Sequence, residues 1–359
     1  PRPELSDKSF MNSVALHVSI WLPTYREQFN PCDSRLSEQH FQNNIFMPIA
    51  RLLRAATIAG CLFAAAALIT GVMAEDYPAL DIFNNGLPLL AAGLLVLFLL
   101  SLSLRTYYLS VASGGLLVMA LLAFGPTQSG PAHQTNHDAK RFMRVTTFNL
   151  HGKGDLHPQK VEAFLAETDP DAVVLEEVRW KHEGFLKHMK TPYPYQAGGH
   201  GLVILSKHPI VDKGRIDRPG EPCWRSLIIN WARLDVNGTQ VDLVGTHMAR
   251  PFYPNQQETD FETLTSFVLS RTGPVIAAGD FNATPWTHKI QHFSAETGLA
   301  RLNTFAPTWP VRWKTLPLLP LLPIDNIFVS PQLAKIDLSI GPRLESDHLP
   351  VIADVALVD

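Results

Sequence analysis

The stretch that decides the fold is Ala277-Ala278-Gly279-Asp280-Phe281-Asn282-Ala283-Thr284-Pro285. An apolar run that begins at Pro274 ends there in two polar residues, Asp280 and Asn282. The run predicts a short buried strand, and Gly279 allows the backbone to turn so that both polar side chains leave the sheet edge together. They are two positions apart, so they face the same way in an extended chain. A polar turn after a core strand would have the same sequence. Polar clusters elsewhere in the chain are needed to choose between such a turn and a functional strand end.

Similar polar clusters end or open other predicted strands. They are Asn149 in Thr-Phe-Asn-Leu-His-Gly, Glu177 in Val-Leu-Glu-Glu-Val, His247 in Gly-Thr-His-Met, Asp325 in Ile-Asp-Asn-Ile-Phe, and Asp347 with His348 in Ser-Asp-His-Leu-Pro. Strand ends are places where distant side chains converge on a rigid scaffold. The collected set is rich in oxygen and contains no Cys, which suits Mg²⁺ before Mn²⁺ or Ca²⁺ and suits zinc poorly.

The C-terminal part of the chain has the pattern of an α/β domain. From Arg144 onward, short apolar strands alternate with amphipathic helices over about 215 residues. The predicted strands are 144–149, 172–176, 201–206, 227–236, 239–246, 275–278, 326–329 and 351–356, and the predicted helices are 157–167, 255–271 and 287–297. Asn237-Gly238 predicts a tight hairpin. Because antiparallel pairs and strand-helix units both occur, we expect two sheets packed face to face with helices outside.

Three apolar runs precede this domain, at 55–74, 87–104 and 107–124. Each is close to the roughly 20 residues that cross a bilayer as a helix. Basic residues flank one end of the runs and acidic residues the other, namely Arg51, Arg54 and Arg105 against Glu75, Asp76 and Asp81. The positive-inside rule therefore predicts an integral membrane protein with three transmembrane helices, a cytoplasmic N-terminus, and an extracytoplasmic domain after Phe124, periplasmic if the cell is bacterial.

Other interpretations of these runs compete with three spans. The first run follows arginines and ends Val72-Met73-Ala74, as a cleaved signal peptide does. All three could instead be core helices of a soluble protein. A transport function has little support, because the spans contain no ionisable residue to line a path.

These patterns divide the chain into four parts. Residues 1–50 form a polar segment to which no function is assigned, since Met47 looks more like a true beginning than Pro1. Residues 51–125 hold the three apolar runs, 126–142 have linker composition, and 143–359 form the α/β domain.

Two motifs in that domain resemble those of a known superfamily. Gly-Asp-Phe-Asn-x-x-Pro at 279–285 and Ser-Asp-His-x-Pro at 346–350 are similar to signatures of the endonuclease/exonuclease/phosphatase superfamily. The resemblance runs from about Arg144 to the C-terminus in the family order. It implies a four-layer α/β-β/α sandwich and a Mg²⁺-dependent hydrolase that acts on phosphoric esters.

The resemblance also implies a role for each strand-end residue. Glu177 resembles the principal metal ligand, with Asn149 and Asp347 close to the same ion. Asp280 and His348 resemble the pair that positions and deprotonates the attacking water, and which of them takes the proton stays open. The remaining assignments are Asp325 to orient His348, His247 and Asn282 to hydrogen-bond phosphate oxygens, and Arg225 to contact substrate, with a solvated strand arginine as the alternative for Arg225.

The sequence departs from the family pattern at two positions. Glu176 stands where the family usually has Gln, and we expect it to face away from the site because adjacent strand residues face opposite ways. Asn326 stands where many relatives carry an aromatic residue or His, which leaves its contacts with substrate in doubt.

The net charge of the domain and one apolar segment narrow the classes of substrate that we expect. The 23 Lys and Arg residues from Pro126 onward are outnumbered by 25 Asp and Glu residues, so the domain lacks the basic excess of a tight DNA binder. Residues 304–323 contain Trp309, Trp313 and a Leu/Pro-rich run that either lies on a bilayer or covers the sheet. We expect a membrane-anchored phosphoesterase acting on phospholipid-type diesters or extracytoplasmic nucleic acid, with a non-catalytic phospho-ligand-binding module as the alternative.

Overall fold

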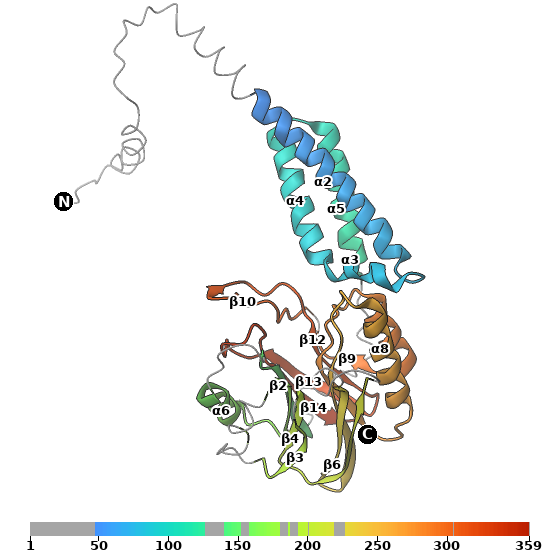
Figure 1. The fold of residues 1–359 in the computed structure, drawn as a ribbon, viewed down its shortest axis with the longest axis vertical. Helices are drawn as coiled ribbons and strands as arrows, with labels where there is room; N and C mark the ends of the chain where they lie inside the picture. Colours follow the sequence, from blue (N-terminus) through green and yellow to red (C-terminus); the bar gives the residue numbers. More distant parts are fainter. Residues whose placement is uncertain are drawn as a thin grey trace, which may run out of the picture. The chain divides into compact units, whose positions relative to one another are not determined.

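The computed structural model describes residues 47–125, 140–151, 158–179, 186, 193–199, 201–218, 227–303 and 305–358 (Figure 1). Predictions for residues 1–46, for the linker at 126–139 and for Arg225 therefore lie outside the described residues.

The three apolar runs form helices, the second and third with nearly the predicted bounds and the first beginning eight residues earlier, at Met47. They are α2 (Met47–Met73), α4 (Leu87–Ser103) and α5 (Tyr107–Ala123), and between the first two lie the 3-10 turn η2 (Pro78–Asp81) and the short helix α3 (Ile82–Asn85). By length and composition α2 can cross a membrane, and Pro78–Asn85 together with α4 can do so only as a pair bent by 54°. Helix α5 is apolar but has only 17 residues.

Two six-stranded sheets form the core of the described C-terminal domain, and the motifs of Asn149, Glu177, His247, Asp280 and Asp325 lie at the ends of their strands. The first sheet has the order β13-β14-β1-β2-β4-β3 and the second β5-β6-β7-β8-β12-β9. The bounds of the first sheet are β1 Met143–Asn149, β2 Ala172–Val178, β3 Tyr195–Gly198, β4 Gly201–Ser206, β13 Leu333–Ile340 and β14 Val351–Leu357. Those of the second are β5 Ile210–Asp217, β6 Leu227–Val236, β7 Thr239–His247, β8 Val275–Asp280, β9 Ala300–Arg301 and β12 Asp325–Val329.

Helices cover the outer face of each sheet, which gives the predicted four layers (Figure 1). Helix α6 (Pro158–Thr168) buries Val161, Phe164 and Leu165 against the first sheet. Helices α8 (Pro254–Leu269) and α9 (His288–Thr297) cover the second sheet through a cluster that includes Phe261 and Phe293. A third apolar cluster fills the space between the sheets. The two packed sheets with outer helices confirm the predicted α/β sandwich.

Parallel pairing brings strand ends together within each sheet. Strands β1 and β2 are parallel, with Asn149 paired to Glu176, and β7 and β8 are parallel, with His247 paired to Asp280. Strand β12 runs antiparallel to β8, so Asp325 opens β12 directly beside Asp280. Backbone pairing therefore places His247, Asp280 and Asp325 at the same end of three neighbouring strands of the second sheet.

Gly279 differs from its predicted place. It lies inside β8, paired with Thr246, and the strand continues through Asp280. Its φ is +152°, and an added Cβ would lie 2.0 Å from the carbonyl oxygen of Thr246. The glycine is needed for a close approach between strands, not for a turn after the strand.

Candidate active site

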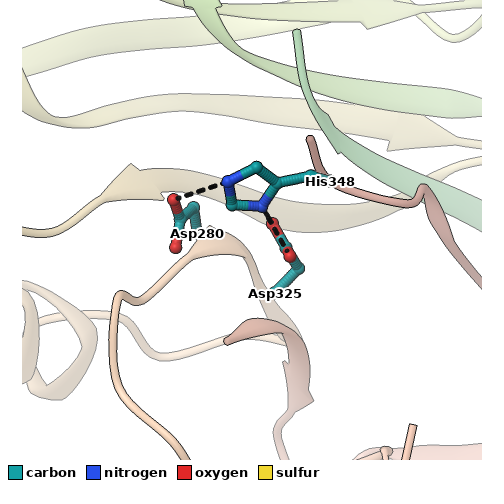
Figure 2. Close-up of side chains that lie close together, drawn as sticks. All are labelled: Asp280, Asp325 and His348. Carbon is teal, nitrogen blue, oxygen red and sulfur yellow. Dashed lines mark hydrogen bonds and ion pairs between the residues drawn. The ribbon is translucent and has the colours of Figure 1, made fainter. Parts of the chain in front are cut away.

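The centre of the site is a buried group of three side chains from two neighbouring strands and one loop. Asp280 ends β8, Asp325 opens β12, and His348 comes from the loop before β14. Figure 2 shows the imidazole between the two carboxylates. Its Nδ1 lies 2.9 Å from Oδ2 and 3.1 Å from Oδ1 of Asp325, and its Nε2 lies 3.9 Å from Oδ2 of Asp280. All three residues are at most 5% exposed.

Burial and mutual charge set the protonation of this group. Burial alone would lower the pKa of His348, but the charge and hydrogen bond of Asp325, with the charges of Asp280 and Asp347, raise it to about 10. Burial raises the pKa of Asp280 to about 6, against the opposing charge of His348. Near neutral pH the two groups therefore form an imidazolium-carboxylate pair.

Three more predicted residues surround the Asp280 carboxylate. Asn149 donates from Nδ2 to Asp280 Oδ2 at 3.1 Å, across from the first sheet. Asn282 donates from its backbone N to Asp280 Oδ1 at 2.8 Å and from Nδ2 to Oδ2 at 3.2 Å. His247 Nε2 lies 3.7 Å from Oδ2. Residues from both sheets thus meet at one carboxylate.

Asp347 lies beside this cluster and is held on both of its oxygens. Trp309 donates from Nε1 to Oδ2 at 3.1 Å, and His151 Nδ1 lies 2.7 Å from Oδ1. The backbone N of His151 also donates to Asn149 Oδ1 at 2.9 Å. Burial alone would raise the pKa of Asp347, but the hydrogen bond from His151 and the charge of His348 lower it to about 2. Asp347 is therefore ionised at any ordinary pH.

Glu177 occupies a β-bulge at the end of β2. Its φ is +53°, and the pairing of β2 with β4 shifts register between Glu176 and Val178. Its Oε1 lies 3.8 Å from Nη2 of Arg250, which follows β7 in the second sheet. The bulge thus breaks the strand alternation at Glu177, whose carboxylate lies beside an arginine that follows β7.

The family described as the Endonuclease/Exonuclease/phosphatase family matches residues 146–348, which is more than half of the chain. The chain belongs to the endonuclease/exonuclease/phosphatase family. None of the curated proteins compared with it matches significantly.

Several solved structures share the fold of this chain at low sequence identity. A functionally unknown conserved protein from Enterococcus faecalis V583 is 19% identical, with a TM-score of 0.51 over 60% of this chain and 100% of that chain. The endonuclease/exonuclease/phosphatase from Bacteroides vulgatus is 18% identical, with a TM-score of 0.50 over 60% and 99%. The D. rerio TDP2 complexed with single strand DNA product is 17% identical, with a TM-score of 0.50 over 59% and 98%.

Glu176, which departs from the usual family residue, was expected to face away from the site, and this prediction is wrong. It is fully buried, and it pairs across β1 and β2 with Asn149, so both side chains lie on the inner face of the first sheet. Thr147 donates a hydrogen bond to Glu176 Oε1. Burial, with the charges of Asp325 and Asp280, raises the pKa of Glu176 well above its usual value. Strand alternation fails as a guide here because the bulge at Glu177 breaks it.

Several residues of the candidate site were not predicted from the sequence. Thr308 donates to Asp325 Oδ2 at 2.5 Å, and the Ser346 hydroxyl donates to the backbone oxygen of Asn149 at 2.7 Å. Ser346 lies within the Ser-Asp-His motif, whereas Thr308 and Trp309 come from an irregular segment with no periodic signal. Asn326 is buried, and its Oδ1 lies 3.4 Å from Nη1 of Arg301.

Proposed function

We propose that the chain is a membrane-anchored, divalent-metal-dependent phosphoesterase that hydrolyses phosphodiester bonds by attack of water. The observation that carries the proposal is the buried group of Asp280, Asp325 and His348, whose ligand atoms lie within 4.8 Å of one another. Amide and imidazole groups of Asn149, Asn282 and His247 surround the same carboxylate. A hydrolase that activates water needs such a positioned, buried acceptor.

We assign proton transfer to Asp280 and His348. With a pKa of about 6, Asp280 is ionised near neutral pH and accepts the proton of the attacking water. His348, with a pKa of about 10, is then a cation that stabilises negative charge on the phosphate. Both carboxylate oxygens of Asp325 lie close to Nδ1 of His348. This contact fixes the imidazole ring and occupies both oxygens of Asp325. This engagement favours a role in proton transfer over direct metal binding for the three-residue group.

We assign the metal to Asn149, Glu177 and Asp347. They offer an amide oxygen and two carboxylates, the donor set that Mg²⁺ prefers, and Mn²⁺ or Ca²⁺ also accept it. Asp347 is ionised at all ordinary pH values, as a metal ligand must be. When bound, the cation neutralises charge on the phosphate and assists the departing oxygen.

Membrane anchoring is supported by the outward faces of the apolar helices. Large apolar side chains on α2, α4 and α5 are between 63 and 76% exposed, namely Leu62, Val72, Val96, Val111 and Leu122. A water-soluble protein rarely exposes so many, so core helices are disfavoured. We propose three spans with the catalytic domain outside the cytoplasm, and a cleaved signal sequence remains the alternative for α2.

A phospholipid-type diester is the substrate that the surface near the site favours. The segment that carries Trp309 continues into the strands β10 (Arg312–Trp313) and β11 (Leu316–Pro317). Trp313 and Leu316 in these strands, and Leu319 just after them, are 60 to 80% exposed. These leucines do not cover the sheet. Trp309 itself contacts Asp347 and lies 6.4 Å from the His348 ring, measured between ring centroids. An apolar surface thus adjoins the reacting groups.

Nucleic acid is the second candidate substrate, because a D. rerio TDP2 of this fold holds a single strand DNA product. Purified full-length protein should be assayed with Mg²⁺ on phospholipid vesicles, single-stranded DNA and duplex DNA, and again after EDTA. We expect hydrolysis of the vesicle lipid that EDTA abolishes. Faster hydrolysis of DNA would assign the nuclease function, and activity that survives EDTA would refute the metal-dependent mechanism. Binding of these ligands without turnover would favour the non-catalytic module.

A further inference from the structure

The connection between the first two apolar helices contacts the segment that follows the Asp280 motif. Asn85 Oδ1 accepts a hydrogen bond from the backbone N of Thr284 at 2.7 Å. Asp81 accepts from the backbone N of His288 at 3.1 Å and of Lys289 at 3.3 Å, and its Oδ2 lies 3.6 Å from Lys289 Nζ. Asp81 and Asn85 are 3% and 7% exposed, so these are buried contacts. We call residues 283–289 the docking segment.

An apolar contact accompanies the polar ones. Trp286, in the middle of the docking segment, is 6% exposed and packs against the ends of the apolar helices. Its ring centroid lies 4.8 Å from that of Phe124, directly after α5, and Leu87 and Leu90 of α4 belong to the same cluster. The docking segment is therefore held both by hydrogen bonds to the helical connection and by the burial of its own Trp286 ring among the apolar helices.

The docking segment begins directly after Asn282, which touches the Asp280 carboxylate. Asn282 is held from the domain side by Gln257, which donates from Nε2 to its carbonyl oxygen at 3.0 Å, and by its own Nδ2, which donates to the Met248 carbonyl at 3.0 Å. Two residues later, Thr284 is held by Asn85 from the helical side. The loop that carries Asn282 is thus fixed from both sides.

We propose that Asp81 and Asn85 are positioning residues for the active site. They fix the docking segment and so hold Asn282 against Asp280, a role that rests on the function proposed above. The α/β domain is accordingly docked on the helical connection. Small displacements of a positioned group are costly, because catalysis depends on alignment within a fraction of an ångström.

The variants that test this keep or remove one hydrogen-bond acceptor. Asn85→Leu removes the acceptor of Thr284 N, whereas Asn85→Asp retains an oxygen at the same place. Asp81→Leu removes the acceptors of His288 N and Lys289 N. Asp76→Asn is the matched control, because Asp76 lies in the same connection and is exposed. All variants are made in the full chain and purified in the same detergent.

The first readout is hydrogen-deuterium exchange of peptides that cover 283–289, which does not depend on activity. We expect slow exchange in the wild type and in Asp76→Asn, about tenfold faster exchange in Asn85→Leu and Asp81→Leu, and slow exchange again in Asn85→Asp. Fast exchange of the docking segment in the wild-type protein would overturn the proposal even if no variant folds.

The second readout is turnover of bis(p-nitrophenyl) phosphate with Mg²⁺. We expect kcat to fall about tenfold in Asn85→Leu with KM changed less than about twofold, and to recover in Asn85→Asp, because alignment and not substrate binding is lost. Faster exchange with unchanged kcat would overturn the positioning role. A wild-type protein that is inactive on every phosphodiester would instead refute the proposed function, and the exchange result would still decide whether the docking contact exists.

Discussion

His348 Nδ1 faces both carboxylate oxygens of Asp325, at 2.9 and 3.1 Å, while Nε2 on the other side of the ring lies 3.9 Å from Asp280. The imidazole is therefore fixed between two buried carboxylates that differ in their contacts. Asp325 is engaged by the ring and by Thr308, and Asp280 is surrounded by amide donors. With the function proposed above, we expect Asp280 to be the group that accepts a proton from water.

The pH dependence of kcat/KM follows from these two groups. The pKa of Asp280 is raised to about 6, so protonation removes the acceptor as pH falls through about 6. The pKa of His348 is raised to about 10, so the imidazolium is lost only as pH rises through about 10. We expect a plateau between these values, measured with bis(p-nitrophenyl) phosphate at constant ionic strength.

Asp325→Asn should shift both limbs of that profile. Asp325 raises the pKa of His348 by its charge and its hydrogen bond, and its charge also raises the pKa of Asp280, so both limbs should move to lower pH, with the larger shift in the alkaline limb. The exposed Asp212→Asn serves as the control, with an unchanged profile. A wild-type rate that stays on its plateau at pH 4, or that falls as pH rises above 6.5, is incompatible with the assignment.

Metal binding should depend on Glu177 and Asp347. Glu177→Gln and Asp347→Asn each remove one anionic ligand, and we expect Mn²⁺ affinity to fall about tenfold or more. Isothermal titration of the full chain with Mn²⁺ measures this without any substrate. Glu262→Gln, an exposed carboxylate on α8, should bind Mn²⁺ as the wild type does. Equal affinities in all four proteins would show that the cation binds elsewhere.

Asp260 should be a major contributor to domain stability. It is fully buried on α8, receives Nε and Nη2 of Arg218 at 2.7 and 2.5 Å, and accepts from the backbone N of Ala249 at 2.7 Å. Asp260→Ala leaves Arg218 without this carboxylate, and we expect the free energy of unfolding to drop by about 3 to 5 kcal/mol.

Denaturant unfolding of the full chain in detergent measures that loss. The exposed pair Arg215–Asp217 supplies the control, because Asp217→Asn should change the free energy of unfolding by less than about 1 kcal/mol. A similar small change for Asp260→Ala would mean that the buried pair adds little.

The sequence predicted the features that depend on local pattern. The apolar runs became helices, Asn237-Gly238 became the hairpin between β6 and β7, and the strand-end clusters met where parallel and antiparallel pairing carries them. The edge strands β5 and β13 were missed because charged residues alternate along them, as in Asp212-Lys213-Gly214-Arg215, and hide the apolar period.

The parts of the site that were missed depend on tertiary contacts. The face of the first sheet on which the Glu176 side chain lies depends on the bulge at Glu177, and no residue pattern marks this bulge. Trp309 and Thr308 reach Asp347 and Asp325 from an irregular segment, and Asn85 reaches Thr284 across about 200 residues of sequence. Spacing along the chain carries no information about such contacts.

Gly279 should tolerate no side chain. Its φ of +152° is unfavourable for any other residue, and the added Cβ of Gly279→Ala would lie 2.0 Å from a backbone oxygen that cannot move without separating β7 from β8. We expect the variant to unfold at markedly lower denaturant concentration than the wild type. Gly238→Ala, in the exposed hairpin with open space around its Cβ position, is the control for positive φ alone. Equal losses in the two variants would contradict the steric argument.

The most direct test of the central claim is the rate of bis(p-nitrophenyl) phosphate hydrolysis by the wild type and by Asp280→Asn, each with Mg²⁺ and after EDTA. We predict that the wild type is active only with Mg²⁺ and that Asp280→Asn loses about 100-fold or more of kcat while still binding Mn²⁺. Asp280→Asn that turns over as fast as the wild type, or hydrolysis that continues in EDTA, would contradict it.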